Sequence, residues 1–88
     1  MKYTKHFKIG EYVVGGIIKV TGGDNIVNIS FLDYTTKEVI LKETFNVLDI
    51  GTRNKIFFYL AGCLPTNGTS YYADKVINFI ETKVALNH

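Results

Sequence analysis

The feature that most constrains this chain is a change in hydrophobic spacing near residue 46. Before this point apolar residues recur at every second position, which is the repeat of a β-strand. After it they recur at every third or fourth position, which is the repeat of an amphipathic helix. A chain of 88 residues has room for one domain. The spacing therefore predicts a single α+β domain, residues 1–88, in which strands precede helices.

The first half predicts three strands joined by short turns. We expect strands at residues 12–21, 25–33 and 38–45, separated by "TGGDN" and "DYTTKE". Glycine and asparagine in the first turn tolerate positive φ, and Asp33 in the second is placed to accept hydrogen bonds from its own turn. Connections this short join antiparallel neighbours, so we expect an antiparallel β-meander.

The second half predicts two helices. The first begins near Thr52 and stops at Gly62, because glycine is favoured just past a helix end. The second covers residues 71–86, where apolar residues fall on one stripe and polar residues fall opposite. The predicted order of elements is therefore β-β-β-α-α.

Two amphipathic helices and a three-stranded sheet bury most apolar surface as a two-layer sandwich. We expect a basic N-terminal arm (1–9), the three-stranded antiparallel β-meander (10–45) and, packed on one of its faces, two C-terminal helices (46–88). The residues expected on the covered face of the sheet are Val14, Ile18, Val20, Val27, Ile29, Phe31, Val39, Leu41 and Phe45.

The opposite face of the sheet also carries apolar side chains, among them Val13, Ile17, Leu32 and Ile40. Two structural explanations stay open. A bulge at Gly15–Gly16 would turn part of the first strand around, or the basic arm would fold back as an extra strand and cover this face. The functional explanation is that the face, or its edge, contacts a partner or a second copy of the chain.

Tyrosines add to this candidate contact surface, because they offer a large contact area at a low entropic cost. Tyr34 lies in a predicted turn, where we expect it to be exposed, and Tyr71 opens the last helix. The candidate partner-binding residues are Val13, Ile17, Leu32, Tyr34, Ile40 and Tyr71.

The net charge of +2 comes from the N-terminus, since Lys2, Lys5 and Lys8 lie in the first ten residues. The other 78 residues carry seven positive and eight negative charges. A nucleic-acid-binding accessory domain is the alternative function, in which the arm contacts phosphates. The candidate residues for it are Lys2, Lys5, Lys8, Arg53 and Lys55.

No motif for catalysis, metal binding or phosphate binding stands out. His6, Cys63 and His88 are far apart in sequence, whereas metal ligands recur at short spacings. Cys63 follows a predicted helix, where the helix dipole disfavours a thiolate, so we expect a buried, inert cysteine. We expect no enzymatic activity, no metal and no cofactor.

The compartment is predicted from what the sequence lacks. A single cysteine allows no disulfide within the chain, the N-terminus has no apolar leader, and no stretch approaches the roughly 18 apolar residues of a membrane span. We therefore expect a soluble cytoplasmic protein without membrane contact.

The layout of strands followed by two short helices, linked by "FFYLAGCLPTNG", resembles small phage-encoded inhibitors of CRISPR effector complexes. This resemblance covers most of the chain and includes no shared motif. It implies a compact protein without chemistry that blocks a larger assembly by surface contact, in the cytoplasm of a phage-infected bacterium. The expected function is therefore that of a non-enzymatic protein-binding module, whose partner is another protein or a second copy of the chain.

Overall fold

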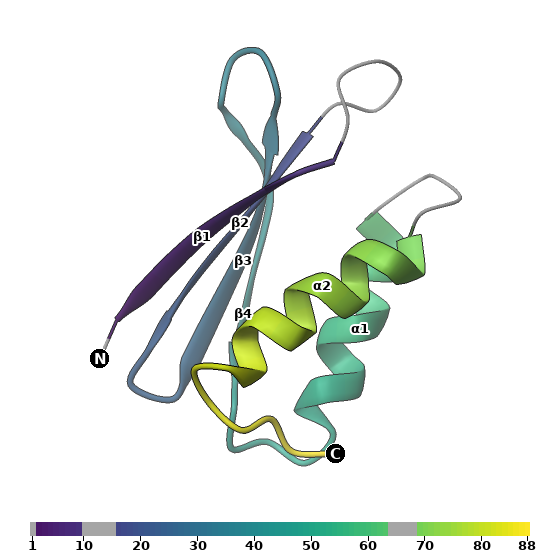
Figure 1. The fold of residues 1–88 in the computed structure, drawn as a ribbon. Coiled ribbons are helices and arrows are strands. Elements are labelled where there is room, and N and C mark those ends of the chain that lie inside the picture. The colour runs from purple at the N-terminus through teal and green to yellow at the C-terminus, as the bar shows by residue number, and fades with distance from the viewer. Residues whose placement is uncertain (1, 10–15, 64–68) are drawn as a thin grey trace. The chain divides into compact units, whose positions relative to one another are not determined.

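The computed structural model describes residues 2–9, 16–63 and 69–88. The chain divides into two compact units, Met1–Thr44 and Phe45–His88, close to the predicted change of spacing. The first unit contains an antiparallel sheet and the second contains two helices (Figure 1). The α+β class and the order of strands before helices are confirmed. That the two units make a single domain stays a prediction.

The sheet has four strands rather than the predicted three. They are β1 (Tyr3–Lys8), β2 (Gly16–Gly23), β3 (Ile26–Asp33) and β4 (Val39–Asn46), and they lie in that order across the sheet. The second and third predicted strands are found within one residue of their predicted bounds. The additional strand is β1, whose residues belong to the predicted basic arm; an extra strand formed by this arm was one of the alternatives that the sequence left open.

Strand β1 pairs antiparallel with β2, from Tyr3 opposite Gly22 to Lys8 opposite Ile17. Its sequence alternates, with Tyr3 and Phe7 on one face, but it also carries several lysines. An edge strand tolerates lysines because its outer side faces solvent. The N-terminal residues therefore add a strand at the edge of the sheet instead of lying over its second face.

The hairpin between β2 and β3 turns at two residues, Asp24 and Asn25, whose φ angles are 55° and 67°. Two positive φ angles are typical of the tight turns that match the twist of a hairpin. The turn lies where "TGGDN" predicts it, but Gly22 belongs to β2. A side chain at Gly22 would overlap the Tyr3 ring, since a Cβ there would lie 2.1 Å from Cζ.

The pairing of β2 with β3 is continuous from Gly16 opposite Asp33 to the turn. Side chains in such a ladder alternate, so Ile17 and Ile18 point to opposite faces of the sheet. No bulge interrupts residues 16–23, and Gly15 lies outside the described residues. A bulge at Gly16 therefore does not explain the apolar second face.

The predicted covered face is found in β2 and β3 but not in β4. Its buried residues are Ile18, Val20, Val27, Ile29 and Phe31. Val39 and Leu41, predicted to be buried with them, are exposed, and Phe45 is half-buried. The prediction was wrong for Val39 and Leu41 because they lie on an edge strand. Val14 lies outside the described residues, and helix packing on this face stays a prediction.

The second unit contains α1 (Thr52–Cys63) and α2 (Thr69–Glu81), which run antiparallel and contact each other (Figure 1). Arg53 Nε and Glu81 Oε1 lie 3.3 Å apart and join the start of one helix to the end of the other. The buried apolar residues of this unit are Val47, Ile56, Leu60, Ala73, Val76, Ile77, Ile80 and Leu86.

The first turn of α1 is capped by the C-terminal segment. The N–H groups of Gly51 and Arg53 donate to the carbonyl oxygens of His88 and Asn87, at 3.2 and 3.0 Å. The first N–H groups of a helix have no partner within it, so these two bonds satisfy groups that need an external acceptor.

Helix α2 ends at Glu81, five residues before its predicted end. Thr82 Oγ1 donates to the carbonyl oxygen of Phe79 at 2.6 Å, and Lys83 N–H donates to Ile80 at 2.8 Å, which tightens the last turn. The chain then leaves the helix, and Leu86 is buried in an irregular segment. The helical spacing that continues to Val84 in the sequence therefore predicted too long a helix.

Candidate protein-binding surface

Strand β4 carries the most exposed apolar stretch of the sheet. It lies at the end of the strand order, so within the described sheet it has a neighbour on one side only (Figure 1). Val39, Ile40 and Leu41 are 56%, 56% and 46% exposed, and we call these three residues the β4 patch. The free edge of a strand offers unpaired backbone N–H and C=O groups to another chain. An exposed apolar stretch at such an edge is a candidate contact surface.

Charged and polar groups bound this patch. Glu38 directly precedes it and Lys42 directly follows it, and both are exposed. Further along β4, Thr44 Oγ1 donates to Asn28 Oδ1 of β3 at 2.6 Å, which ties the strand to its neighbour. The apolar stretch is therefore three residues long and has opposite charges at its two ends.

The predicted contact residues on the second face of the sheet do not form one exposed surface. Ile17 and Leu32 are direct partners in the ladder of β2 and β3, but they are only 7% and 9% exposed. Ile40 is exposed, and Val13 lies outside the described residues. In this conformation Ile40 offers a contact surface, whereas Ile17 and Leu32 offer little.

The turn between β3 and β4 is built on Asp33. Its Oδ1 accepts hydrogen bonds from the N–H groups of Thr35 and Thr36, both at 2.8 Å, as the sequence predicts. These bonds, led by the one from Thr36, hold the pKa of the Asp33 carboxyl below its ordinary value. Tyr34 is half-buried rather than exposed, and Lys37 Nζ lies 4.6 Å from its ring centroid. Part of the Tyr34 ring is therefore already in contact within the chain.

Tyr71, in the other unit, is 57% exposed. Its ring packs edge to face against Tyr72, with centroids 5.4 Å apart, and Lys75 Nζ lies 4.6 Å from its centroid. Hydrogen bonding to Tyr71 raises the pKa of the Lys75 ammonium group. Tyr71 is thus an exposed aromatic residue held in place by its neighbours, in a unit separate from the β4 patch.

Sequence reasoning missed several exposed apolar residues. Val39 and Leu41 were predicted to be buried, and Phe58 of α1 is 70% exposed, with its ring 5.9 Å from that of Phe57. The exposure of Phe58 could have been predicted from its position in the sequence of α1. It lies two positions from Ile56 and from Leu60, which places it on the opposite side of the helix from these two buried residues.

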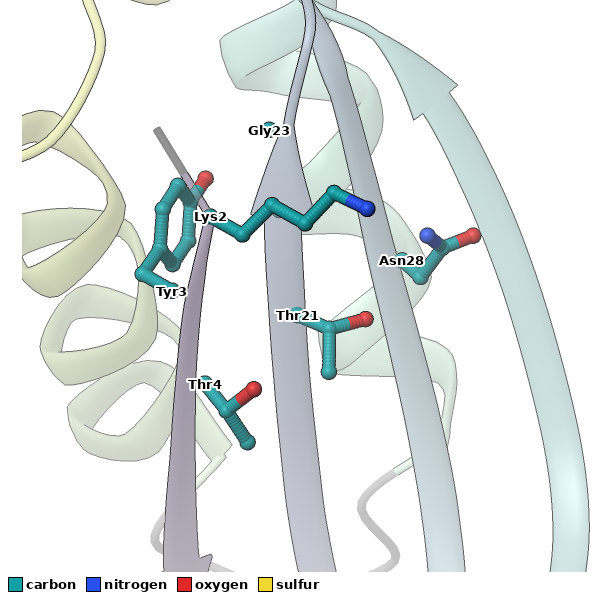
Figure 2. Close-up of a pocket in the computed structure, with 7 residues that line it drawn as sticks. Lys2, Tyr3, Thr4, Thr21, Gly23 and Asn28 are labelled. Carbon is teal, nitrogen blue, oxygen red and sulfur yellow. The ribbon is translucent and has the colours of Figure 1, made fainter.

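A shallow hollow of about 250 Å³ opens at one end of the sheet (Figure 2). Its lining residues are Lys2, Tyr3, Thr4, Thr21, Gly22, Gly23 and Asn28. Thr4, Thr21 and Asn28 are successive partners across β1, β2 and β3, and Lys2 extends across the sheet towards Asn28 (Figure 2). The side chains of Lys2, Thr4, Thr21 and Asn28 are able to hydrogen-bond a ligand, but the hollow is smaller than ordinary small-molecule sites of roughly 300–1,000 Å³. Its described lining residues include no histidine, cysteine or carboxylate.

The lysines of the alternative nucleic-acid function do not share one face. Lys5 and Lys8 are an odd number of positions apart on β1, so they point to opposite sides of the sheet. Lys5 Nζ lies 5.1 Å from the Phe7 ring centroid, and Lys2 lies at the polar hollow. The charge of β1 is therefore divided between two surfaces.

The two other basic candidates lie on α1. Arg53 is engaged by Glu81 in the ion pair described above, which offsets its charge, and Lys55 is exposed. They belong to a different unit from the lysines of β1. The described residues therefore do not bring the five basic candidates together on one unit.

Among the described residues, no three His, Cys, Asp or Glu side chains lie close enough together to hold a metal ion. His6 lies on β1 and His88 lies in the other unit. Cys63 is the last residue of α1, but its side chain lies outside the described residues, so its burial stays a prediction. Neither helix, over the ranges described, has the length and apolar character required to cross a membrane.

Comparison with known proteins gives no relative for this chain: no family model matches it, and neither a curated protein nor a solved structure does. A function must therefore be inferred from its own residues and their arrangement. Of the surfaces described, the β4 patch combines exposed apolar side chains with free backbone groups at the edge of a sheet.

Proposed function

We propose that this chain is a non-enzymatic protein-binding module that acts by surface contact, and that its contact surface centres on the β4 patch. One observation carries the proposal. Val39, Ile40 and Leu41 are about half exposed on a strand that has a neighbour on one side only within the described sheet. Because apolar side chains and free backbone groups occur together on this strand, they favour a partner segment that contacts the side chains and also hydrogen-bonds the backbone.

The partner binds by adding a strand to the edge of β4. In this mode backbone hydrogen bonds supply part of the affinity, and side chains on the two faces of the new strand pair supply specificity. Ile40 points to one face of the sheet and Val39 and Leu41 point to the other, because successive side chains of a strand alternate. The partner strand therefore presents apolar residues opposite all three.

The expected complex is reversible. A standard interface buries about 800 Å² on each partner, and a contact over a few residues of one strand is smaller than this. Small interfaces of this kind are typical of weak, transient encounters. We therefore expect micromolar affinity unless surfaces beyond the β4 patch also take part.

The resemblance to small phage-encoded inhibitors suggests a more specific form of the proposal. In this form the chain occupies a surface that a larger assembly needs, and it blocks that assembly without any reaction. An exposed strand edge suits this role, because it binds an extended segment through backbone groups that every protein has. The β4 patch would then be the inhibitory surface.

The test compares immobilised wild-type protein with two variants, Ile40→Arg and Ile50→Arg, in capture from an extract of the host cell. Both variants place the same charge at an exposed isoleucine, but Ile50 is 86% exposed and lies outside β4. We expect one or more proteins to bind the wild type and Ile50→Arg and to be lost with Ile40→Arg. Nuclease treatment of the captured material should leave binding unchanged.

Circular dichroism first establishes that both variants are folded. Equal capture by wild type and Ile40→Arg would show that the β4 patch is not the contact surface. Loss of the captured material on nuclease treatment would favour the nucleic-acid function instead. If the wild type binds neither another protein nor a second copy of itself, the proposed function is wrong.

A further inference from the structure

We infer that the strand that pairs with β4 is β4 of a second copy of this chain, aligned antiparallel and centred on Ile40. The inference rests on the proposed function, because it names the partner of the same patch. It goes further by giving the register of the contact, which can be tested residue by residue.

The sequence around the patch is self-complementary. When two copies of "EVILK" (38–42) pair antiparallel about Ile40, Ile40 lies opposite Ile40 and each Val39 lies opposite Leu41 of the other copy. Each Glu38 then lies opposite Lys42 of the other copy, so two pairs of opposite charge flank three apolar pairs. Opposite charges and apolar pairs placed directly across two strands stabilise a sheet.

Neighbouring registers lose this match. Residues that lie directly opposite each other in two paired strands must point to the same face of the sheet. The two-fold axis can therefore pass through a residue but not between two residues, and the alternative registers are those centred on other residues. Centring on Leu41 places Ile40 opposite Lys42, and centring on Lys42 places two lysines opposite each other. Centring on Val39 places Glu38 opposite Ile40. The Ile40 register is therefore the one that pairs apolar with apolar and acidic with basic.

Symmetry makes each favourable contact occur twice. A two-fold axis at Ile40, perpendicular to the sheet, gives an isologous interface in which the same strand serves both partners. Two four-stranded sheets then join into one, and the exposed edge of each β4 is covered by the other. The opposite edge does not offer this match, because self-pairing of β1 would bring together strands whose charges are all positive.

Charge reversal tests the register in solution. Sedimentation equilibrium should show a monomer–dimer equilibrium for the wild type, and Lys42→Glu or Glu38→Lys alone should weaken it at least about tenfold, since each creates two like-charge pairs. The double variant Glu38→Lys with Lys42→Glu restores opposite charges and should return to within about threefold of the wild type. Lys5→Glu on β1 is the matched control and should leave dimerisation nearly unchanged.

Cross-linking tests the position of the axis. In a Cys63→Ser background, Ile40→Cys places two thiols opposite each other, where cross-strand Cβ atoms are about 4.5–5.5 Å apart. Oxidation should link the two copies rapidly. Leu41→Cys is the control, because position 41 lies opposite Val39 of the other copy, and its cross-linking should be much slower.

The outcomes separate this inference from the proposed function. A wild type that stays monomeric while Ile40→Arg abolishes capture of another protein overturns the inference and leaves the proposed function standing. A dimer that resists the single charge reversals uses another surface and also overturns the inference. If a single reversal unfolds the chain, the restored double variant still decides, because only pairing about Ile40 predicts its recovery.

Discussion

Residues 16–20 of β2 and 38–42 of β4 have nearly the same composition and opposite environments. "GIIKV" and "EVILK" each contain three aliphatic residues and a lysine. The aliphatic residues of the first segment are at most 7% exposed, whereas those of the second are at least 46% exposed. The apolar content of a strand therefore does not tell whether its side chains are buried.

The difference follows from the places of the two strands in the sheet. Strand β2 pairs with β1 on one side and β3 on the other, so side chains on neighbouring strands flank it on both sides. Strand β4 lies at the end of the strand order. Apolar side chains in a central strand contribute to the core, and the same side chains at an edge become a surface that another chain can cover.

The largest expected effect is that of a buried charge. Val20 of β2 is completely buried, and Val20→Asp places an unpaired carboxylate there at a cost of several kcal/mol, about as much as the total stability of a chain of this size. We expect the variant to be unfolded by circular dichroism at neutral pH. Ile40→Asp, on β4, should remain folded and change the free energy of unfolding by less than about 1 kcal/mol. A folded Val20→Asp would show that the contrast between the strands is much weaker than the burial indicates.

Truncation of the side chain gives a graded version of the same comparison. Ile18→Ala removes a buried side chain and should lower the free energy of unfolding by about 3 kcal/mol. Ile40→Ala removes a side chain that is already half exposed and should cost less than about 1 kcal/mol. Urea unfolding of purified protein, at a concentration where it is monomeric, measures both. Equal losses would mean that Ile40 is packed as tightly as Ile18.

A smaller effect is expected at Gly16, the first residue of β2. A Cβ at this position would lie 2.7 Å from Cζ of Phe31, so the ring must move to admit it. Overpacking of this kind costs about 1–3 kcal/mol, and we expect Gly16→Ala to fall in the lower half of that range. Gly62→Ala, at an exposed position near the end of α1, meets no atom within 4 Å and should instead stabilise the helix slightly. Thermal unfolding of the two variants shows whether each change lowers or raises the stability of the protein.

The smallest effect concerns the turn that leads into β4. Because hydrogen bonds lower the pKa of the Asp33 carboxyl in the folded state, ionised Asp33 favours folding above its ordinary value of 3.8. This contribution is lost as the pH falls through the lowered pKa. We expect the amide signals of Thr35 and Thr36 to shift at that pH in an NMR titration. Asp33→Asn, which keeps an acceptor oxygen but does not ionise there, should abolish the shift.

Much of the local structure could be predicted from the sequence. The spacing of apolar residues placed β3, β4 and α1 within about one residue of their bounds, and Asp33 correctly indicated its turn. These features depend on residues that are close in sequence. Alternation along a strand, glycine in a turn and a side chain that bonds its own backbone are local consequences of backbone geometry.

Other features were missed because their signals are ambiguous. Strand β1 carries Lys5, His6 and Lys8 among its aromatic residues, and such a segment reads equally as an edge strand or a charged arm. The end of α2 was misplaced because Val84 continues the helical spacing although α2 ends at Glu81. In both cases the pattern fits two structures, and contacts outside the segment decide between them.

The candidate site also combines residues that were predicted correctly with residues that were not. Ile40 was predicted as a contact residue, and the structure places it at the exposed edge of the sheet, but Ile17 and Leu32 were predicted with it and are buried. Val39 and Leu41 were predicted to be core and are exposed. The sequence names the apolar residues of each strand, but their exposure depends on which strands lie beside them.

The sequence by itself thus determined the α+β class, the order of strands before helices and the hairpin turns. It also contains the self-complementary segment 38–42, whose meaning depends on exposure. Only the tertiary structure decided that four strands form the sheet, that β2 is central and that β4 is an edge. The physical reason is that spacing reports local backbone geometry, whereas burial depends on neighbours brought together from distant parts of the chain.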